Sequence, residues 1–361
     1  MRIDEKYYGM DKMHFMDADL YDNKLLIYDS ESRDFFAYNI DDELIVNLKI
    51  LGTDSFTLDT ARKIIRKGKD LYVIQNFPCA IFVFRQEEGI RYLCKIEVKG
   101  FGGRVKNAYG YKGKIWMFPT EINQPIAVYD MENNSIDLIL CDNGNEKRTI
   151  GDIAYNNGKC VFMTLENSCD LVIFDLDSRK KRIVNTGINE YICGITIRNE
   201  EIILRTDNGK FIYSIDIEKK TRRILAKSNE KYEKKGKLIV APNGTIIICP
   251  VFSDQFYYVD ERLQNIREIY KENDIVNTSG ATYTIGTLVY QRRIIVLPWG
   301  GNGLTHIRCS NGVWTVRKDS LKMKKKDYWI YKKNKVAFET EIYENDEMRL
   351  NEYLEMISVS S

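Results

Sequence analysis

The chain is poor in proline and carries almost no net charge. Only six prolines occur in 361 residues, and 54 Lys and Arg stand against 52 Asp and Glu, a net charge of +2. With 23 Tyr and 15 Phe beside so little proline, the composition is typical of an ordered, strand-rich protein and excludes a disordered one. A near-neutral chain has no global attraction for nucleic acid or anionic membrane, so we do not expect a nucleic-acid partner.

Long apolar runs and close cysteine pairs are also missing. No window approaches 18 apolar residues, and the charged N-terminus has no apolar core like that of a secretory signal. The eight cysteines form no CxxC pair, which favours free thiols buried as small hydrophobic side chains in a reducing compartment. The sequence therefore predicts a cytoplasmic protein without a membrane partner.

Histidine is the scarcest residue type that matters for chemistry. Only His14 and His306 occur, which excludes a histidine-rich zinc site, and a cysteine-only site lacks the usual close pairs. No nucleophile or paired carboxylate accompanies either histidine in the sequence. We expect structural roles for both, with no metal, no cofactor and no catalytic residue.

What the chain does contain is a repeat. The phrase IAVYDMENNSIDLI (126–139) returns as LVIFDLDSRKKRIV (171–184) and as FIYSIDIEKKTRRIL (211–225). Each runs apolar, breaks at turn-forming residues and runs apolar again, as a β-hairpin does. The residues that open these turns lie 41 to 49 residues apart, at Asn39, Arg85, Asp130, Asp175, Asp216, Asp260 and, more weakly, Cys309.

A period of roughly 40 to 50 residues made of strand-like pieces is the signature of a β-propeller blade. The third repeat divides into four strands, from the innermost to the outermost, at 105–111, 114–119, 126–131 and 135–140. The sequence thus predicts an all-β propeller of four-stranded blades. Two β-sandwich domains are the alternative, but sandwiches do not repeat internally at a constant interval. The repeats start near Phe15, Ile64, Val105, Gly151, Gly194, Lys237 and Ala281.

Seven blades fit this count best, and six or eight remain open. Either the segment before Phe15 or residues 328–344, YWIYKKNKVAFETEIYE, is expected to supply a strand that closes the ring. Apolar side chains in 345–357 have helical spacing, with Asn345 as the N-cap, so a short C-terminal helix is predicted. We expect one propeller domain over residues 1–343 and a helical tail, 344–361, packed on it.

By its repeats the chain resembles kelch-like and WD-like β-propeller proteins over roughly residues 15–320. It has no Trp-Asp dipeptide and no Gly-His pair, and the glycine doublets at 102–103 and 300–301 do not recur in every unit. The resemblance implies the propeller fold, and no functional residues of either group carry over to this sequence.

Ligands of propellers meet the face built by the loops between second and third strands and by the links between blades. Polar groups beside aromatic side chains in these loops suit a sugar or an extended peptide, although any tight loop needs many of the same residue types. In LPWGGNG the two glycines are expected to turn the chain and bring Trp299 to the mouth, unless its ring packs between blades. The predicted ligand-binding residues are Phe77, Arg104, Glu121, Asn123, Gln124, Glu166, Asp207, Asn208, Phe252, Asp254 and Trp299.

These residues favour a non-catalytic binding or scaffold propeller that recognises a protein, a peptide or a glycan through its loop face. The alternative is a hydrolase or lyase that modifies a carbohydrate or peptide with carboxylates from different blades, such as Glu121 with Asp207 or Asp254. Asp175 and Asp177 are interpreted as a solvated hairpin on the opposite face. The basic runs 62–69 and 322–335 favour a solvated surface, the second a lysine-rich sheet edge, over a nucleic-acid site.

Overall fold

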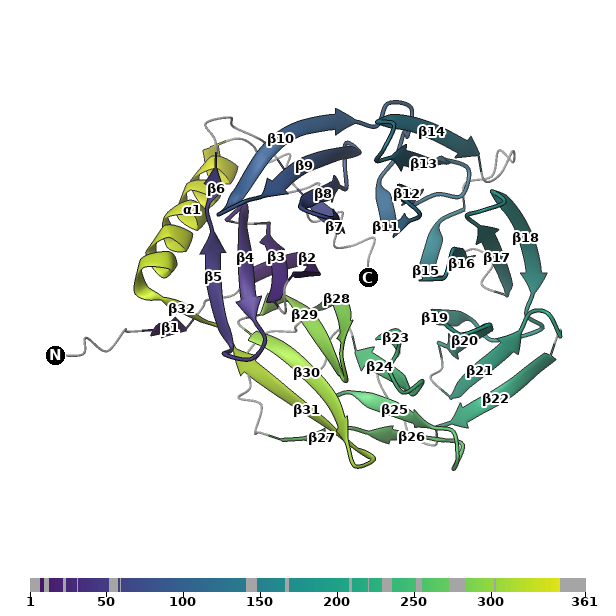
Figure 1. The fold of residues 1–361 in the computed structure, drawn as a ribbon. Coiled ribbons are helices and arrows are strands. Elements are labelled where there is room, and N and C mark those ends of the chain that lie inside the picture. The colour runs from purple at the N-terminus through teal and green to yellow at the C-terminus, as the bar shows by residue number, and fades with distance from the viewer. Residues whose placement is uncertain are drawn as a thin grey trace.

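The computed structural model forms a ring of β-sheets around a central axis, with one helix on its outside (Figure 1). The described residues therefore form an all-β propeller, as the repeat predicts, followed by one C-terminal helix. The structure describes residues 7–9, 13–21, 24–30, 32–51, 58, 60–140, 148–165, 169–207, 210–219, 221–228, 236–250, 255–272, 283–301 and 303–344.

Three sheets stand alone in the ring. The first has the order β6-β10-β9-β8-β7 and the others run β11 to β14 and β15 to β18. Their strands are β6 (Ile50–Leu51), β7 (Ala61–Lys67), β8 (Asp70–Gln75), β9 (Ala80–Gln86), β10 (Ile90–Glu97), β11 (Val105–Tyr111), β12 (Lys114–Pro119), β13 (Pro125–Asp130), β14 (Ser135–Leu140), β15 (Ile150–Asn156), β16 (Lys159–Thr164), β17 (Asp170–Asp175) and β18 (Lys180–Asn185).

The next sheet has eight strands in the order β19-β20-β21-β22-β26-β25-β24-β23. A single parallel pair, Lys227 with Asn265, joins its two halves at their outer strands. Its strands are β19 (Ile192–Arg198), β20 (Glu201–Thr206), β21 (Phe211–Asp216), β22 (Thr221–Lys227), β23 (Gly236–Val240), β24 (Ile246–Pro250), β25 (Tyr257–Asp260) and β26 (Asn265–Glu268).

The last sheet brings both ends of the described chain together. Its order is β1-β32-β5-β4-β3-β2-β29-β30-β31-β27, with β28 paired to β29. The strands are β1 (Tyr7–Gly9), β2 (Met13–Tyr21), β3 (Lys24–Asp29), β4 (Asp34–Asn39), β5 (Leu44–Leu48), β27 (Tyr270–Lys271), β28 (Tyr283–Tyr290), β29 (Arg293–Gly301), β30 (Gly303–Ser310), β31 (Val313–Ser320) and β32 (Lys322–Lys324), followed by the helix α1 (Lys325–Glu344).

The strand assignment for the third repeat is confirmed. β11, β12 and β14 have the predicted bounds, and β13 begins one residue earlier. The strands nearest the axis in Figure 1 are β2, β7, β11, β15, β19, β23 and β28, which we call the inner strands.

Burial explains why the middle strands read as continuous apolar runs. β12 and β16 are buried at five of six positions because neighbouring sheets cover both of their faces, whereas β14 and β18 are mostly exposed. Between two sheets, Phe118 meets Phe162 and Phe174 edge to face with ring centroids 6.3 and 6.2 Å apart. Such aromatic pairs stabilise a core beyond the area they bury.

The aspartates that end the third strands are turn residues, as predicted. Oδ1 of Asp130 accepts hydrogen bonds from the backbone N–H groups of Glu132 (2.9 Å) and Asn133 (3.1 Å). Oδ1 of Asp175 accepts from the N–H of Ser178 at 2.7 Å. These backbone N–H groups and the Lys114 side chain, which contributes most, hold the pKa of Asp130 well below its usual range. The aspartates of the repeated sequence therefore stabilise the turns between the third and fourth strands.

Carboxylates on the inner strands fasten neighbouring sheets to each other. Oδ2 of Asp17 accepts a hydrogen bond from the backbone N–H of Ile64 at 2.8 Å and lies 3.0 Å from Nζ of Lys63. Asp152 repeats the contact with the N–H of Ile195 at 3.1 Å. Both acceptors lie on an inner strand and reach the next inner strand around the ring.

We expect Asp17→Ala to lower the free energy of unfolding by about 2 kcal/mol, because it leaves the buried Ile64 N–H and the Lys63 ammonium without their acceptor. Urea denaturation measures the loss. Asp19→Ala is the matched control: burial raises the pKa of Asp19, so its ionised form stabilises the fold less. Equal losses in the two variants would contradict this role of Asp17.

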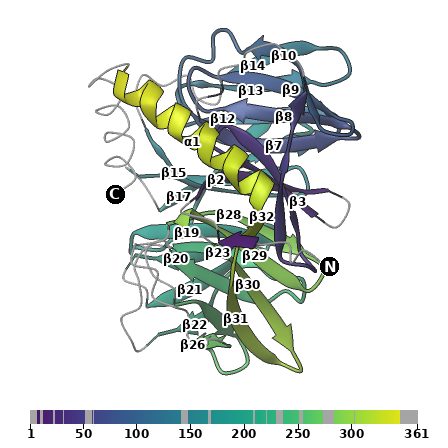
Figure 2. The ribbon, with the colours of Figure 1, turned by 90° about the vertical axis from the view of Figure 1, so that its left-hand side faces the viewer.

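The C-terminal segment differs from the prediction. Residues 325–344 form α1, so interpreting 328–344 as a ring-closing strand is wrong. The predicted lysine-rich strand edge is wrong as well, because β32 is paired with β1 on one side and with β5 on the other. The ring of Tyr331 is fully buried and meets Phe36 edge to face at 5.9 Å. Figure 2 shows α1 across the outside of the ring beside β1 and β32. The helix predicted at 345–357 lies outside the described residues.

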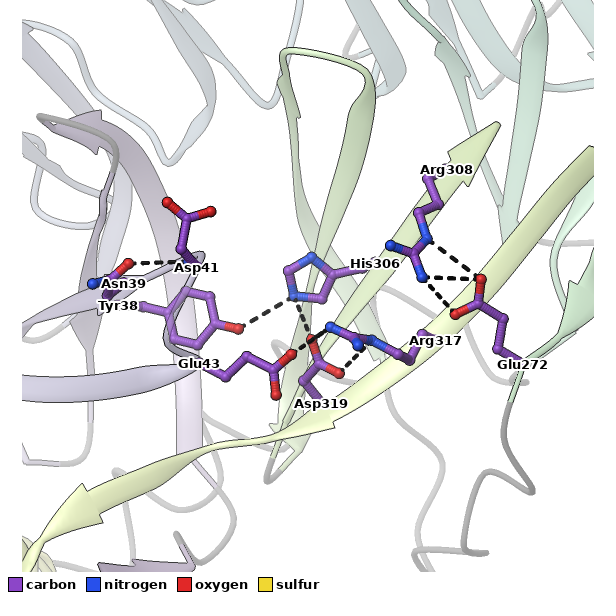
Figure 3. Close-up of polar contacts among 9 residues, drawn as sticks. All are labelled: Tyr38, Asn39, Asp41, Glu43, Glu272, His306, Arg308, Arg317 and Asp319. Atoms are coloured by element: carbon purple, nitrogen blue, oxygen red, sulfur yellow. Dashed lines mark hydrogen bonds and ion pairs between the residues drawn. The ribbon is translucent and has the colours of Figure 1, made fainter. Parts of the chain in front are cut away.

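His306 belongs to the seam between the first and last strands of the ring (Figure 3). Its Nε2 lies 3.2 Å from Oδ2 of Asp319 and 3.4 Å from the hydroxyl of Tyr38. Arg317 pairs with both Asp319 and Glu43. Burial, with the nearby Arg317, lowers the pKa of His306 to about 4, so its ring is neutral at pH 7. The seam is thus a structural hydrogen-bond network.

Candidate functional site

The loops after the second strands and the links between sheets meet on one face of the ring, which we call the loop face. After β12, the N–H of Thr120 donates to the carbonyl of Arg104 at 3.0 Å, and the N–H of Ile122 donates to that of Arg148 at 2.9 Å. Glu121 forms an isolated bridge with Thr149. One loop is thereby tied to the links on both of its sides.

The same backbone contact recurs around the loop face. Besides Thr120, the first residue after the second strand donates its N–H to the preceding link in three further units: Asn76 to Thr60 (2.8 Å), Leu165 to Thr149 (2.9 Å) and Asp207 to Tyr191 (2.7 Å). Because backbone bonds fix these loops, the face is organised before any ligand binds.

Four predicted residues, Arg104, Glu121, Asn123 and Gln124, come together in this part of the face, all partly buried. The side-chain oxygens of Asn123 and Gln124 are buried and accept no hydrogen bond from any residue that the structure describes. The Gln124 amide packs directly on Gly103, where a Cβ would collide with it. These two amide oxygens are therefore polar atoms of the loop face that have no donor among the described residues.

Phe77 is the clearest predicted ligand contact. Its side chain is 55% exposed on the loop after β8. Nε2 of Gln75 holds this loop by donating to the carbonyls of Phe77 (3.4 Å) and Pro78 (3.1 Å). A large exposed ring on a fixed loop is a ready hydrophobic contact for a partner.

Of the remaining predicted residues, the structure describes only the backbone of Trp299 and none of the other four. Trp299 lies within β29, paired with His14 and Tyr283 through the backbone, and not in the tight glycine turn expected for it. β29 continues through Gly301 because its edge is paired there with β2. The predicted contacts Glu166, Asn208, Phe252 and Asp254 lie outside the described residues.

Two apolar side chains of the loop face were not predicted. Leu165 is 44% exposed beside the link at Thr149, and Tyr191 is 41% exposed on the link that holds Asp207. With Phe77 they form three exposed apolar groups on loops of different sheets. Their signal in the sequence was weak because single apolar residues in loops are common.

A charged cluster on the inner strands was also missed. It contains Arg62, Lys106, Lys237 and Asp152, each the second or third residue of its strand. Burial, followed by the charge of Arg62, lowers the pKa values of Lys106 and Lys237 to about 8. Burial raises the pKa of Asp152, against the opposing effect of Lys106. The only signal in the sequence was that Lys106 and Lys237 lie at the start of a repeat and Arg62 lies just before one.

The opposite face carries an open pocket of about 630 Å³. Arg198 lies within it and pairs with Glu201 (2.9 Å) and with Glu261, and Trp314 forms part of its wall. Asp177 lies on this face too, where it accepts hydrogen bonds from Tyr111 and Lys112, as the predicted solvated hairpin requires.

Metal-binding clusters and membrane-spanning helices are absent from the described residues. Within the described parts of the chain, no three His, Cys, Asp or Glu side chains gather in a way that suits a metal ion. In those parts, no helix is long and apolar enough to cross a membrane.

No family model and no curated protein match the sequence. The fold, however, is similar to solved structures. YCF48 bound to D1 peptide has a TM-score of 0.63 at 8% identity, covering 86% of this chain and 99% of that one. The WD40 β-propeller domain of Doa1 has a TM-score of 0.58 at 12% identity, covering 85% and 97%.

A third similar structure is an enzyme. A catalytically inactive histidine-to-alanine variant of virginiamycin B lyase from Staphylococcus aureus, with quinupristin, has a TM-score of 0.60 at 12% identity. The match covers 81% of this chain and 96% of that one. At these identities the likeness concerns the propeller fold alone, which hosts both binding proteins and enzymes.

Proposed function

We propose that the protein is a non-catalytic binding propeller that takes a segment of a partner protein or a peptide on its loop face. The observation that carries this is the preformed face itself: loops tied by backbone hydrogen bonds present exposed Phe77, Leu165 and Tyr191. Beside them lie the amide oxygens of Asn123 and Gln124, which lack donors among the described residues. Apolar contacts with a few fixed polar groups suit an extended peptide.

The similar structures support this class of function without establishing it. YCF48 was solved bound to a D1 peptide, so a propeller of this general shape accepts a peptide. A glycan remains the other ligand class that polar loops beside aromatic rings suit. The lyase favours the enzyme alternative, for which Glu121 and Asp207 stand on loops of different sheets.

We further infer that the ring has seven four-stranded blades within one domain of residues 1–343, followed by the tail 344–361. Support comes from the antiparallel pairing of consecutive strands, with additional pairs between outer strands linking blades into larger sheets. The proposed blades are β2–β5, β7–β10, β11–β14, β15–β18, β19–β22, β23–β26 and β28–β31.

Peptide selection tests the binding function. A random dodecapeptide library displayed on phage is enriched on the immobilised protein, and the enriched peptides are synthesised and titrated. We expect Phe77→Ala/Leu165→Ala to weaken their binding about tenfold or more, because two exposed apolar contacts are lost. Leu140→Ala/Ile183→Ala is the matched control, since these side chains are 62% and 57% exposed on outer strands. No enrichment, or equal binding by both variants, would overturn the proposal.

A further inference from the structure

Six of the inner strands share an irregularity in their backbone pairing near the strand start. In β2, β7, β11, β15, β19 and β28 the pairing register shifts next to the start of the strand. A β-bulge of this kind re-aims the side chain of the extra residue. The extra residues are Met16, Arg62, Lys106, Gly151, Cys193 and Ile285.

Two of these bulges carry cations, and β23 contributes a third. Lys237 is the second residue of β23, whose register is regular. Nε of Arg62 donates to the carbonyl of Lys106 at 2.8 Å, which joins the first two cations directly. All three side chains keep some contact with solvent, most of all Lys237, although the surrounding strands desolvate their charged groups enough to shift the pKa values of both lysines.

These cations meet across the axis. β11 packs against β7 and β15, whereas β23 packs against β19 and β28, so Lys106 and Lys237 do not lie on neighbouring strands. Figure 1 shows β11 and β23 on opposite sides of the ring centre. Their charges nevertheless interact, since Lys237 contributes, after burial and Arg62, to lowering the pKa of Lys106. Both lysines are the second residues of inner strands, which line the axis.

Among the residues that the structure describes, more cations than carboxylates lie at the axis. Arg62, Lys63, Lys106 and Lys237 face the two carboxylates Asp17 and Asp152. Asp17 is engaged by Lys63, and both oxygens of Asp152 accept backbone N–H groups, from Ile153 at 2.9 Å and Ile195 at 3.1 Å. Nζ of Lys106 makes no hydrogen bond with any residue in the described ranges. Excess positive charge held close together in a partly desolvated place favours an anion.

The cluster lies at the end of the ring that carries the loop face. Lys106 directly follows Val105, which pairs with Pro119 at the start of the 120–124 loop, and Gly236 likewise pairs with Pro250 before Lys237. The cations therefore lie just beneath the loop face. A segment held by Phe77, Leu165 and Tyr191 would pass directly over them.

We propose that Arg62, Lys106 and Lys237 form an anion-binding site beneath the loop face, which takes a carboxylate or phosphate group carried by the bound peptide segment. The inference rests on the proposed peptide-binding function and adds the chemistry of the partner. Carboxylate and phosphate share the negative oxygens that Arg and Lys bind by charge-assisted hydrogen bonds. A neutral glycan has no such group.

Three fluorescein-labelled peptides of one length test the site by fluorescence polarisation: hexaglutamate, hexaglutamine, and alanine with a central phosphoserine. We expect hexaglutamate, the phosphopeptide or both to bind more tightly than hexaglutamine, which identifies the source of the anion. Lys106→Gln/Lys237→Gln is expected to weaken that binding about tenfold or more. Lys112→Gln/Lys219→Gln, which removes exposed lysines from the opposite face, should leave it unchanged.

The pH dependence of peptide binding gives a second readout. Because the pKa values of the two lysines lie near 8, binding should weaken between pH 7 and pH 9 as they lose their protons. The Gln pair should bind equally weakly at both values. The charged or titratable groups that face the lysines are Arg62, Lys63, Asp17, Asp152 and Cys249.

Several results would overturn the site. One is that neither hexaglutamate nor the phosphopeptide binds more tightly than hexaglutamine. Another is that the control variant Lys112→Gln/Lys219→Gln loses as much affinity as Lys106→Gln/Lys237→Gln. The third is that the protein binds inorganic phosphate but neither of the two charged peptides. If phage-selected peptides bind the Gln pair with unchanged affinity yet are lost from Phe77→Ala/Leu165→Ala, the anion site fails and the binding function stands. Lys106→Met/Lys237→Met, of similar side-chain length, replaces the Gln pair if circular dichroism shows that the Gln pair does not fold.

Discussion

Tyr331→Ala should lower the free energy of unfolding by about 3 to 4 kcal/mol. The ring of Tyr331 is fully buried and packs with Phe36, Leu321 and Met323, all equally buried. Removing it leaves a cavity between α1 and the sheet that contains β1, β32 and β5, which an outer helix cannot fill without shifting. Urea denaturation followed by circular dichroism measures the loss.

Trp329→Ala is the matched control for this prediction. Trp329 lies two residues away on the same helix and is 57% exposed. Its removal should change the free energy of unfolding by no more than about 0.5 kcal/mol. If the two variants unfold at the same urea concentration, α1 is not packed on the ring through Tyr331.

The repeat made the sheets predictable from the sequence. In β12 and β16 the apolar side chains are continuous because both faces of a middle strand are covered. The outer strand β14 alternates apolar with polar residues only from Ser135 to Leu138, and its burial pattern shows that it is mostly exposed. Turn residues mark the ends, as the positive φ of Lys112 (45°) and Gly113 (72°) shows for the first hairpin of β11 and β12. Strand bounds therefore followed from local rules repeated many times.

The helix α1 was not predicted because its local preferences conflict. Tyr328, Trp329 and Tyr331 favour strands intrinsically, and the segment follows a run of strands. The deciding contact is tertiary: Tyr331 is buried against Phe36, almost 300 residues earlier in the chain. Nδ2 of Asn334 also donates to Oδ2 of Asp34 at 2.7 Å. Such distant partners leave no local pattern in a sequence.

The candidate site was predictable only in part, for a related reason. Loop residues such as Asn123 and Gln124 were found because the repeat shows which loops share a face. The axial cations were missed because Arg62 and Lys63 read locally as part of a solvated basic run. The cluster can be recognised only in the folded ring, where β7, β11 and β23 surround one axis and bring together charges that are far apart in the sequence.

His306 should make the fold less stable in acid. Its pKa is about 4 in the folded protein, against about 6.5 in an unfolded chain. The unfolded state therefore binds more protons between these values, so the contribution of neutral His306 is complete above pH 6.5 and is lost as the pH falls toward 4. The shift corresponds to about 3 kcal/mol. His306→Gln removes the titration while keeping a hydrogen-bonding side chain.

The titration of Asp34 changes the stability of the fold in the opposite direction to that of His306, so the two effects offset each other in the wild-type protein. Burial, opposed by the hydrogen bonds from Asn334 and Asn47, raises the pKa of Asp34 to about 6, against about 3.9 unfolded. Its protonated form therefore stabilises the fold as the pH falls below 6, by about 3 kcal/mol in full. The wild-type profile between pH 6.5 and 4.5 combines two nearly opposite slopes.

Each titration becomes visible in the variant that removes the other. From pH 7 to 4.5, Asp34→Asn should lose about 2 to 3 kcal/mol of stability relative to its value at pH 7, because the titration of Asp34 no longer offsets that of His306. His306→Gln should gain stability over the same range relative to wild type. Urea midpoints at both pH values measure these differences. Parallel profiles for wild type and His306→Gln would mean that the pKa of His306 is the same in the folded and unfolded states, so that Asp319, 3.2 Å away, offsets the effect of burial.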